Sequence, residues 1–122
     1  MVPMKLCILD NDVLDPAVAP TYISYGHMLA RLLRDAGAAH WQMDIFDATK
    51  QQFPARWGDY DAVLLTGSKE DSFSDTPWVV ELRHQITALL QTQTTLLGVC
   101  FGHQLIALCM GCLLYTSDAA DE

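Results

Sequence analysis

The sequence predicts an α/β fold in which a parallel sheet carries helices on its faces. Two observations lead to this prediction. Short apolar runs typical of buried strands alternate along the chain with stretches whose apolar residues recur every three or four positions, as on one face of a helix. Polar loops separate the two kinds of element, as in strand–helix–strand units. A chain of 122 residues forms one domain at most.

The first half of the chain carries two predicted strands on either side of one predicted helix. Residues 4–9 are a compact apolar run that ends in the polar loop 10–12, and residues 40–46 alternate well enough for a second strand. Between them, residues 22–36 have helical periodicity, and Gly37 is expected to end the helix as its C-cap. The predicted buried face of this helix consists of Tyr25, Met28, Leu29, Leu32, Leu33 and Ala36.

The second half of the chain repeats the alternation. Residues 61–66 and 96–99 are predicted strands, and a helix is expected from Cys100 to about residue 110. A further helix opens at Thr76 and Pro77, because threonine is a good N-cap and proline fits the first helical position. Its predicted buried face consists of Trp78, Val79, Leu82, Ile86, Leu89 and Leu90.

One cysteine stands at a predicted strand-to-helix turn between two glycines. The segment reads Gly98-Val99-Cys100-Phe101-Gly102, which is a nucleophile elbow with cysteine in place of the usual serine. Gly98 and Gly102 are expected to make room for the tight turn. The helix that follows directs its N-terminal amides at the sulfur, an arrangement that favours the thiolate. The pattern predicts that Cys100 is a nucleophile rather than a buried structural cysteine.

The composition excludes several classes of protein. The formal net charge is −8 and no basic patch exists, so we expect no nucleic-acid partner. No apolar run approaches the ~20 residues that cross a bilayer, and the chain starts without a recognisable secretory signal. We therefore expect a cytoplasmic protein with reduced cysteines, no membrane partner, no metal ion and no other cofactor. The pair Cys109-x-x-Cys112 by itself is a weak signal for a metal or redox site.

Aromatic and acidic residues outside the elbow have ordinary explanations. Trp41, Trp57 and Trp78 are spaced as packing residues rather than as a ligand-stacking site. The loop that contains Glu70 and Asp71 lacks the ligand density of a calcium loop and is expected to be a solvated rim near the mouth of the substrate site.

Residues 96–107, LLGVCFGHQLIA, resemble the nucleophile motif of the class I glutamine amidotransferases. Residues 64–82 resemble the loop and helix that precede this motif in the GMP-synthase-like subgroup. The resemblance implies a flavodoxin-like α/β fold. It also implies hydrolysis of the glutamine side-chain amide through a γ-glutamyl thioester on the cysteine, with release of ammonia.

The same resemblance implies a role for individual residues. Cys100 is the nucleophile, and the backbone N–H groups of Ser68 and Phe101 form the oxyanion hole. Gly67 keeps the turn before Ser68 open, and Gln104 contacts the bound glutamine. This sequence has Ser68 where the family often has a second glycine, a change that leaves a backbone donor in place.

The remaining catalytic residues of the family have no counterpart in this sequence. The family completes its triad with a histidine and a glutamate in an H-x-E motif well after the nucleophile, and no such motif follows Cys100. His103 is expected to serve the start of its helix rather than act as a base. The match fails from Cys112, so we predict a partial amidotransferase domain over residues 1–111, cut short after the nucleophile helix, and a non-native tail over residues 112–122. The 122-residue chain is predicted to be inactive.

Three functions remain open. The first is a glutaminase domain that passes ammonia to a synthase domain or subunit. The second is a cysteine peptidase or γ-glutamyl hydrolase of the same fold, acting on a γ-glutamyl compound. The third is a non-catalytic binding domain, against which the combination of Cys100, Gln104 and the Gly67-Ser68 turn weighs.

Overall fold

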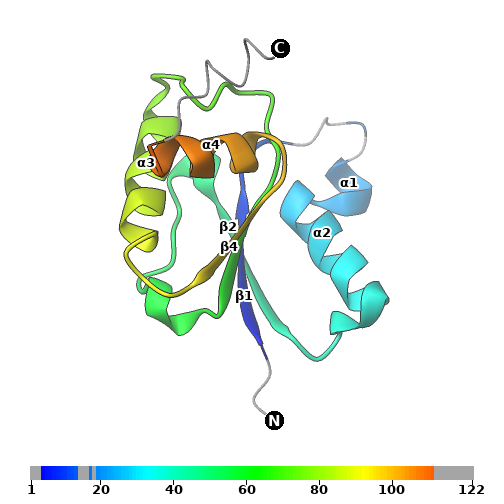
Figure 1. The fold of residues 1–122 in the computed structure, drawn as a ribbon. Helices are drawn as coiled ribbons and strands as arrows, with labels where there is room; N and C mark the ends of the chain where they lie inside the picture. The colour runs from blue at the N-terminus through cyan, green and yellow to red at the C-terminus, as the bar shows by residue number, and fades with distance from the viewer. Residues whose placement is uncertain (1–3, 14–16, 18, 112–122) are drawn as a thin grey trace.

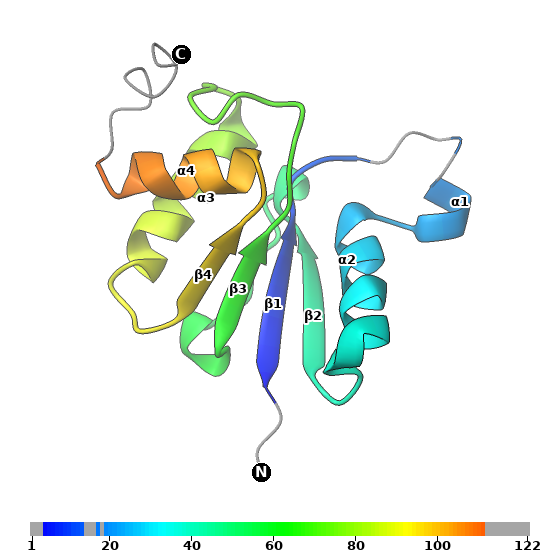
Figure 2. The same ribbon diagram turned by 45° about the vertical axis from the view of Figure 1, so that its right-hand side comes forward.

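The computed structural model describes residues 4–13, 17 and 19–111 and shows a parallel four-stranded sheet (Figures 1 and 2). Its strand order is β2-β1-β3-β4, the order of the flavodoxin-like doubly wound folds. All three strand pairs are parallel, as predicted. The strands are β1 (Lys5–Asp10), β2 (Gln42–Asp47), β3 (Ala62–Leu65) and β4 (Thr95–Gly98). Each strand lies within two residues of its predicted bounds.

Helices cover both faces of the sheet (Figure 2). One face packs against α2 (Tyr25–Leu33), through a core of Leu6, Ile8, Ala30, Ala62 and Leu64. The other face carries the larger core and packs against α3 (Pro77–Leu89) and α4 (Phe101–Cys109). This division follows from the alternation of side chains along each strand, since Leu6 and Ile8 face α2 whereas Cys7 and Leu9 face α3 and α4.

The predicted buried face of α2 is wrong in part. Gly26 and Ala30 are the residues of α2 that are fully buried, whereas Leu32 is 63% exposed. The small side chains let the helix lie close to the sheet, and Leu29 and Leu33 pack against the same core as partly buried residues. Periodicity identified the helix but left Gly26 and Ala30 out of its buried face, and it included Ala36, which is exposed. The helix is also shorter than predicted, since α1 (Ala19–Tyr22) precedes it and a π-helical turn (Arg34–Ala38) follows it. Gly37 lies inside this turn with a positive φ of 117° and marks a kink there, so it is not the predicted C-cap: the C-cap of α2 is Arg34 and that of the π-helical turn is Ala39.

The start of α3 agrees with the prediction in position and differs in its contacts. Pro77 occupies the first turn, and Thr76 is the N-cap residue. The Thr76 hydroxyl makes no capping bond to the helix; it lies 2.7 Å from the hydroxyl of Ser74 instead. Val79, Leu82, Ile86 and Leu89 are fully buried, as expected.

The carboxyl ends of β1, β3 and β4 meet at one edge of the sheet. The N–H of Thr66 donates to the carbonyl of Leu9 at 3.1 Å, and the N–H of Val99 donates to the carbonyl of Leu65 at 3.1 Å. The loops that leave these strands are therefore held side by side, which is where ligands bind in open α/β sheets. In the described part of the chain, the helices are too short or too polar to cross a bilayer.

Candidate active site at the carboxyl edge of the sheet

Cys100 occupies the turn between β4 and α4 in a strained backbone conformation. Its φ is 48° and its ψ is −104°, in a region that residues other than glycine rarely adopt. Such a conformation costs about 1–3 kcal/mol and persists where the surroundings impose it. Cys100 is the N-cap residue of α4, and its side chain is exposed. A strand, a tight turn and a helix thus present this sulfur to solvent.

The two glycines beside Cys100 are enforced by close backbone contacts. A Cβ atom on Gly98 would lie 2.5 Å from the backbone nitrogen of His103, and a Cβ atom on Gly102 would lie 2.7 Å from both the Cβ and the carbonyl oxygen of Leu65. Side chains do not reach such distances without moving the backbone. The first turn of α4 can therefore lie against β3 and β4 because both positions lack a side chain.

A cleft of about 400 Å³ opens beside the sulfur. The loops after β1, β3 and β4 form one side of it, and α2 forms the other. The residues that line it are Asp12, Tyr25, Met28, Leu29, Thr66, Gly67, Ser68, Lys69, Val99 and Cys100. The structure thus brings Cys100, Gly67 and Ser68 together, although Gly67 and Cys100 are 33 positions apart in the sequence.

The two predicted oxyanion donors are backbone groups, one in the loop after β3 and one at the start of α4. Phe101 is the first residue of α4, so its N–H has no partner within the helix. The hydroxyl of Ser68 accepts the N–H of Glu70 at 3.0 Å, which holds the loop after β3 in a tight turn. Among the described residues, neither the Phe101 N–H nor the Ser68 N–H donates to another group. Within the described part of the chain, no group competes with a ligand for these two N–H donors.

Gly67 has more room than predicted. A Cβ atom there would lie 3.7 Å from the carbonyl oxygen of Val99 and 3.8 Å from the Cβ of Cys100, which are ordinary contact distances. Its backbone does not adopt a positive φ. The turn before Ser68 therefore does not itself require glycine, in contrast to the elbow.

Gln104 and His103 lie on α4 outside the cleft. The backbone N–H of Gln104 donates to the carbonyl of Cys100 at 2.9 Å, so the residue follows the nucleophile by one turn, but its side chain is exposed and does not line the cleft. His103 is exposed as well. Among the described residues, no histidine lines the cleft.

The cleft also contains residues that the sequence pattern did not single out. The Asp12 carboxylate joins two loops, because one oxygen accepts the N–H of Val13 and the other accepts the N–H of Lys69, both at 2.8 Å. Next to it, Asn11 is fully buried and bonded to Thr66. Their position directly after β1 was the available signal, because polar residues at the carboxyl end of a buried strand face the ligand edge of such sheets.

The other described cysteines are less accessible than Cys100. Burial, with a smaller contribution from the Asp44 carboxylate, raises the pKa of the Cys7 thiol to about 12. Burial also raises the pKa of Cys109, whose thiol donates to the carbonyl of Arg83. Cys112, the second cysteine of the Cys109-x-x-Cys112 pair, lies outside the described residues. Of the three cysteines in the described part of the chain, only Cys100 is exposed.

Comparisons with known proteins identify relatives of this chain. The sequence model of the family described as glutamine amidotransferase class-I matches residues 17–121. Gamma-glutamyl peptidase 4 of Arabidopsis thaliana is 37% identical over 93 residues, which are 75% of this chain and 36% of that protein. The glutamine amidotransferase-like protein chyE of Penicillium rubens is 34% identical over 114 residues, which are 88% of this chain and 45% of that protein.

The solved structures show the same fold. A glutamine amidotransferase of Thermotoga maritima superposes with a TM-score of 0.68 at 19% identity, over 91% of this chain and 44% of that chain. The chain thus spans less than half the length of each relative compared. Because the family match extends over most of the sequence and the fold agrees with it, the chain belongs to the class I glutamine amidotransferase family.

Proposed function

We propose that Cys100 is the nucleophile of a hydrolase that cleaves γ-glutamyl amide bonds. The observation that carries this proposal is the exposed sulfur of Cys100, set on a strained turn at the N-terminus of α4 and on the wall of a cleft. Activated cysteines are found in such partly exposed sites at helix N-termini. A structural cysteine would more often be buried, as Cys7 is.

The proposed reaction has two steps. The Cys100 sulfur forms a bond to the amide carbon at the end of the glutamyl side chain. The oxyanion that results accepts hydrogen bonds from the backbone N–H groups of Ser68 and Phe101. The carbon–nitrogen bond then breaks, and the nitrogen leaves as ammonia or an amine after it takes up the proton that the Cys100 thiol has lost. Water attacks the γ-glutamyl thioester, which returns the thiol and releases the γ-carboxylate.

The leaving group separates two candidate substrates. If it is ammonia, the substrate is glutamine, and the domain would supply a synthase domain or subunit, as in the GMP-synthase-like subgroup. If it is a larger amine, the substrate is a γ-glutamyl compound, a possibility favoured by two relatives that are named as gamma-glutamyl peptidases, 4 and 3 of Arabidopsis thaliana. Either reaction requires a reduced thiol, so we also propose a reducing compartment such as the cytoplasm.

Covalent labelling with a chloroketone analogue of glutamine tests the proposed site. We expect the reagent to alkylate Cys100, as mapped by peptide mass spectrometry, and we expect free ligand to slow the alkylation. Greater protection by glutamine would indicate the glutaminase. Greater protection by a γ-glutamyl dipeptide would indicate the peptidase.

Two variants make the labelling specific. Cys100→Ala should abolish the label, whereas Cys109→Ala should leave it intact, because Cys109 is less exposed and lies outside the cleft. Iodoacetamide serves as a reagent without a glutamyl group, and ligand should protect Cys100 from it as well. Alkylation of Cys100 that neither glutamine nor the dipeptide slows would contradict the proposal and favour a non-catalytic binding domain.

A further inference from the structure

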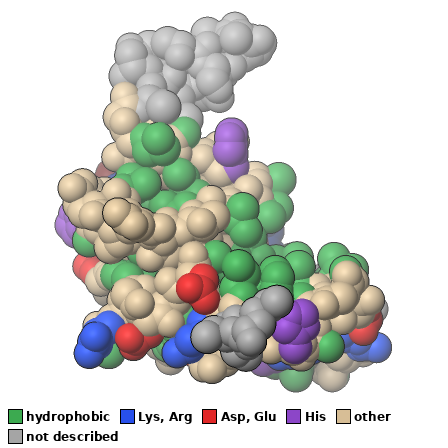
Figure 3. Space-filling model, turned by 60° about the horizontal axis from the view of Figure 1, so that its bottom comes forward, with side chains coloured by type: hydrophobic (Ala, Val, Ile, Leu, Met, Phe, Trp, Pro, Cys, Tyr) green, Lys and Arg blue, Asp and Glu red, His purple; other side chains and the backbone are tan. Residues whose placement is uncertain are grey.

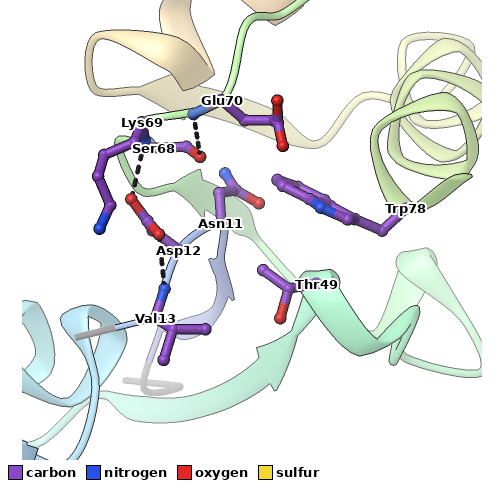
Figure 4. Close-up of a pocket in the computed structure, with 8 residues that line it drawn as sticks. All are labelled: Asn11, Asp12, Val13, Thr49, Ser68, Lys69, Glu70 and Trp78. Carbon is purple, nitrogen blue, oxygen red and sulfur yellow. Dashed lines mark hydrogen bonds between the residues drawn. The ribbon is translucent and has the colours of Figure 1, made fainter. Parts of the chain in front are cut away.

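A second pocket lies next to the cleft of Cys100, on the side of the sheet that carries α3 (Figure 4). It has a volume of about 310 Å³ and shares Asp12, Ser68 and Lys69 with the cleft. The remaining walls come from the loop after β1, the 3-10 turn after β2, the loop after β3 and the first turn of α3. The other residues that line it are Asn11, Val13, Thr49, Glu70 and Trp78.

A buried hydrogen-bond acceptor in this pocket has no donor. Asn11 is fully buried; its backbone N–H donates to the Thr66 hydroxyl at 2.8 Å, and its side-chain nitrogen donates to the Thr66 carbonyl at 2.9 Å. A carbonyl oxygen can only accept, so this second bond fixes the orientation of the Asn11 amide. Its Oδ1 then has no partner among the described residues. Leaving such an acceptor unpaired is unfavourable, because it has lost its hydrogen bonds to water without gaining a protein donor.

The groups around Asn11 favour a positively charged ligand. Figure 4 shows the amide oxygen of Asn11 directed to the side of the pocket where Trp78 lies, and the Glu70 carboxylate extended to the same side. Within the described residues, the Glu70 carboxylate has no hydrogen bond or ion pair. An amide oxygen, a carboxylate and an indole ring together suit an ammonium ion, which donates hydrogen bonds and attracts the face of an aromatic ring.

Other ligand classes fit the pocket less well. The charged residues that line the pocket are Asp12, Glu70 and Lys69, so an anion would meet two carboxylates against one ammonium group. A metal ion would need more ligands, since the described residues hold no group of three or more histidine, cysteine, aspartate or glutamate side chains that could bind one. The volume suits a small organic molecule.

We propose that this pocket binds the primary ammonium group of a small organic ligand. One N–H of the ligand donates to the Asn11 Oδ1, and the Glu70 carboxylate balances the charge. Because this oxygen is buried, the Trp78 ring turns aside from it to admit the ligand and then packs on the cation. Two sources share this chemistry: the α-ammonium group of a γ-glutamyl substrate, reaching across Ser68 from the cleft, or a separate amine. The first source rests on the function proposed above, and the second does not.

The experiment follows the indole N–H signal of Trp78 by NMR while the 122-residue protein is titrated with ethylammonium chloride. Ethanol at equal concentration is the uncharged control, and sodium chloride is the control for ionic strength. We expect a saturable shift with ethylammonium alone, and the signal is assigned with Trp78→Phe. Glu70→Gln should weaken the apparent affinity roughly threefold, the scale of an exposed charge pair.

A matched control in the same loop is Asp71→Asn, which removes the same charge outside the pocket and keeps the acceptor for the N–H of Phe73. It should leave the affinity unchanged. Asn11→Ala should abolish the shift, and Glu70→Gln provides the test if that variant does not fold. Equal shifts with ethylammonium and ethanol, or equal weakening by Glu70→Gln and Asp71→Asn, would overturn the proposal.

Titration with glutamine distinguishes the two sources. If the substrate's own ammonium group binds, glutamine shifts the Trp78 signal at a lower concentration than ethylammonium does. Alkylation of Cys100 then removes this difference in concentration. If the ligand is a separate amine, ethylammonium shifts the signal equally well with Cys100 alkylated, and glutamine has no advantage. Both results support the pocket, and neither depends on whether the chloroketone labels Cys100.

Discussion

At the scale of single residues, the elbow depends on the absence of side chains beside Cys100. Gly98 and Gly102 meet backbone atoms of α4 and β3 at distances that no Cβ atom tolerates, whereas Gly67 has ordinary space around it. Glycine at the first two positions is therefore a packing requirement. The strain at Cys100 itself is held by this packing and by the bond from the Gly102 N–H to the Val99 carbonyl at 2.9 Å.

We predict that Gly102→Ala destabilises the protein by about 1–3 kcal/mol, the usual cost of forcing an extra group into a packed site. The added methyl group would press on the Leu65 backbone and push the first turn of α4 away from β3. Urea denaturation followed by circular dichroism measures the free energy of unfolding. Gly58→Ala is the matched control, because a Cβ there meets nothing within 4 Å and the backbone has no positive φ. An equal loss in the two variants would refute this account of the elbow.

At the scale of elements, the junction of β1 and α2 is built on a buried carboxylate. Asp10 is 5% exposed and accepts the N–H of Gly26 in the first turn of α2. Ser24 caps the same helix by accepting the N–H of His27 at 3.0 Å. Burial raises the pKa of Asp10 above its ordinary value of 3.8, although hydrogen bonds from Ser24 and Gly26 act in the opposite direction.

This junction is predicted to make stability depend on pH. Because the pKa of Asp10 is higher in the folded protein than in the unfolded chain, its contribution to stability is fully present below the unfolded value of 3.8 and is lost as pH rises through the folded pKa. We compare the free energy of unfolding of the wild type with that of Asp10→Asn, which keeps the acceptor oxygen but does not titrate. The wild type should lose stability relative to the variant across this window. A difference that stays constant with pH, or that changes in favour of the wild type, would contradict the prediction.

The strands and helices show how far local pattern extends. The alternation of apolar runs predicted all four strands and the three longer helices, because each run is long enough to identify its own periodicity. The orientation of α2 could not be predicted in the same way. It depends on Gly26 and Ala30 lying against Asp10, Ile45 and their neighbours in the sheet, which are distant contacts that no helical period encodes.

At the scale of the whole molecule, the two faces of the sheet are covered unequally. The face that carries α3 and α4 is continuous with the main core. On the other face α2 leaves an apolar hollow of about 320 Å³, lined in part by Leu64 and Leu97, and the side chains of Leu97 and Val99 are 50% and 43% exposed. Hydrophobic side chains also gather on the side of the molecule seen in Figure 3. Of these exposed residues, Val99 lines the cleft at Cys100, whereas the hollow is lined by other residues.

We predict that the 122-residue chain releases no ammonia from glutamine. Expulsion of ammonia requires a positioned acid, and no histidine of the described residues lines the cleft at Cys100. A glutamate-dehydrogenase-coupled assay measures the ammonia, with Cys100→Ala as the control for contamination. Turnover by the wild type that Cys100→Ala abolishes would refute the prediction.

The predicted boundary at residue 111 is a separate matter, which an independently recovered coding sequence would test.

The sequence by itself determined the order of the elements, the parallel sheet, the family and the cysteine between two glycines. These features depend on neighbours within a few positions of each other, or on a motif that one segment carries whole. Only the tertiary structure decided which residues share the cleft, that Gln104 lies outside it, and that Asn11 and Trp78 line a pocket next to it. These juxtapositions arise where the ends of β1, β3 and β4 converge, because strand pairing brings together loops that lie tens of residues apart along the chain.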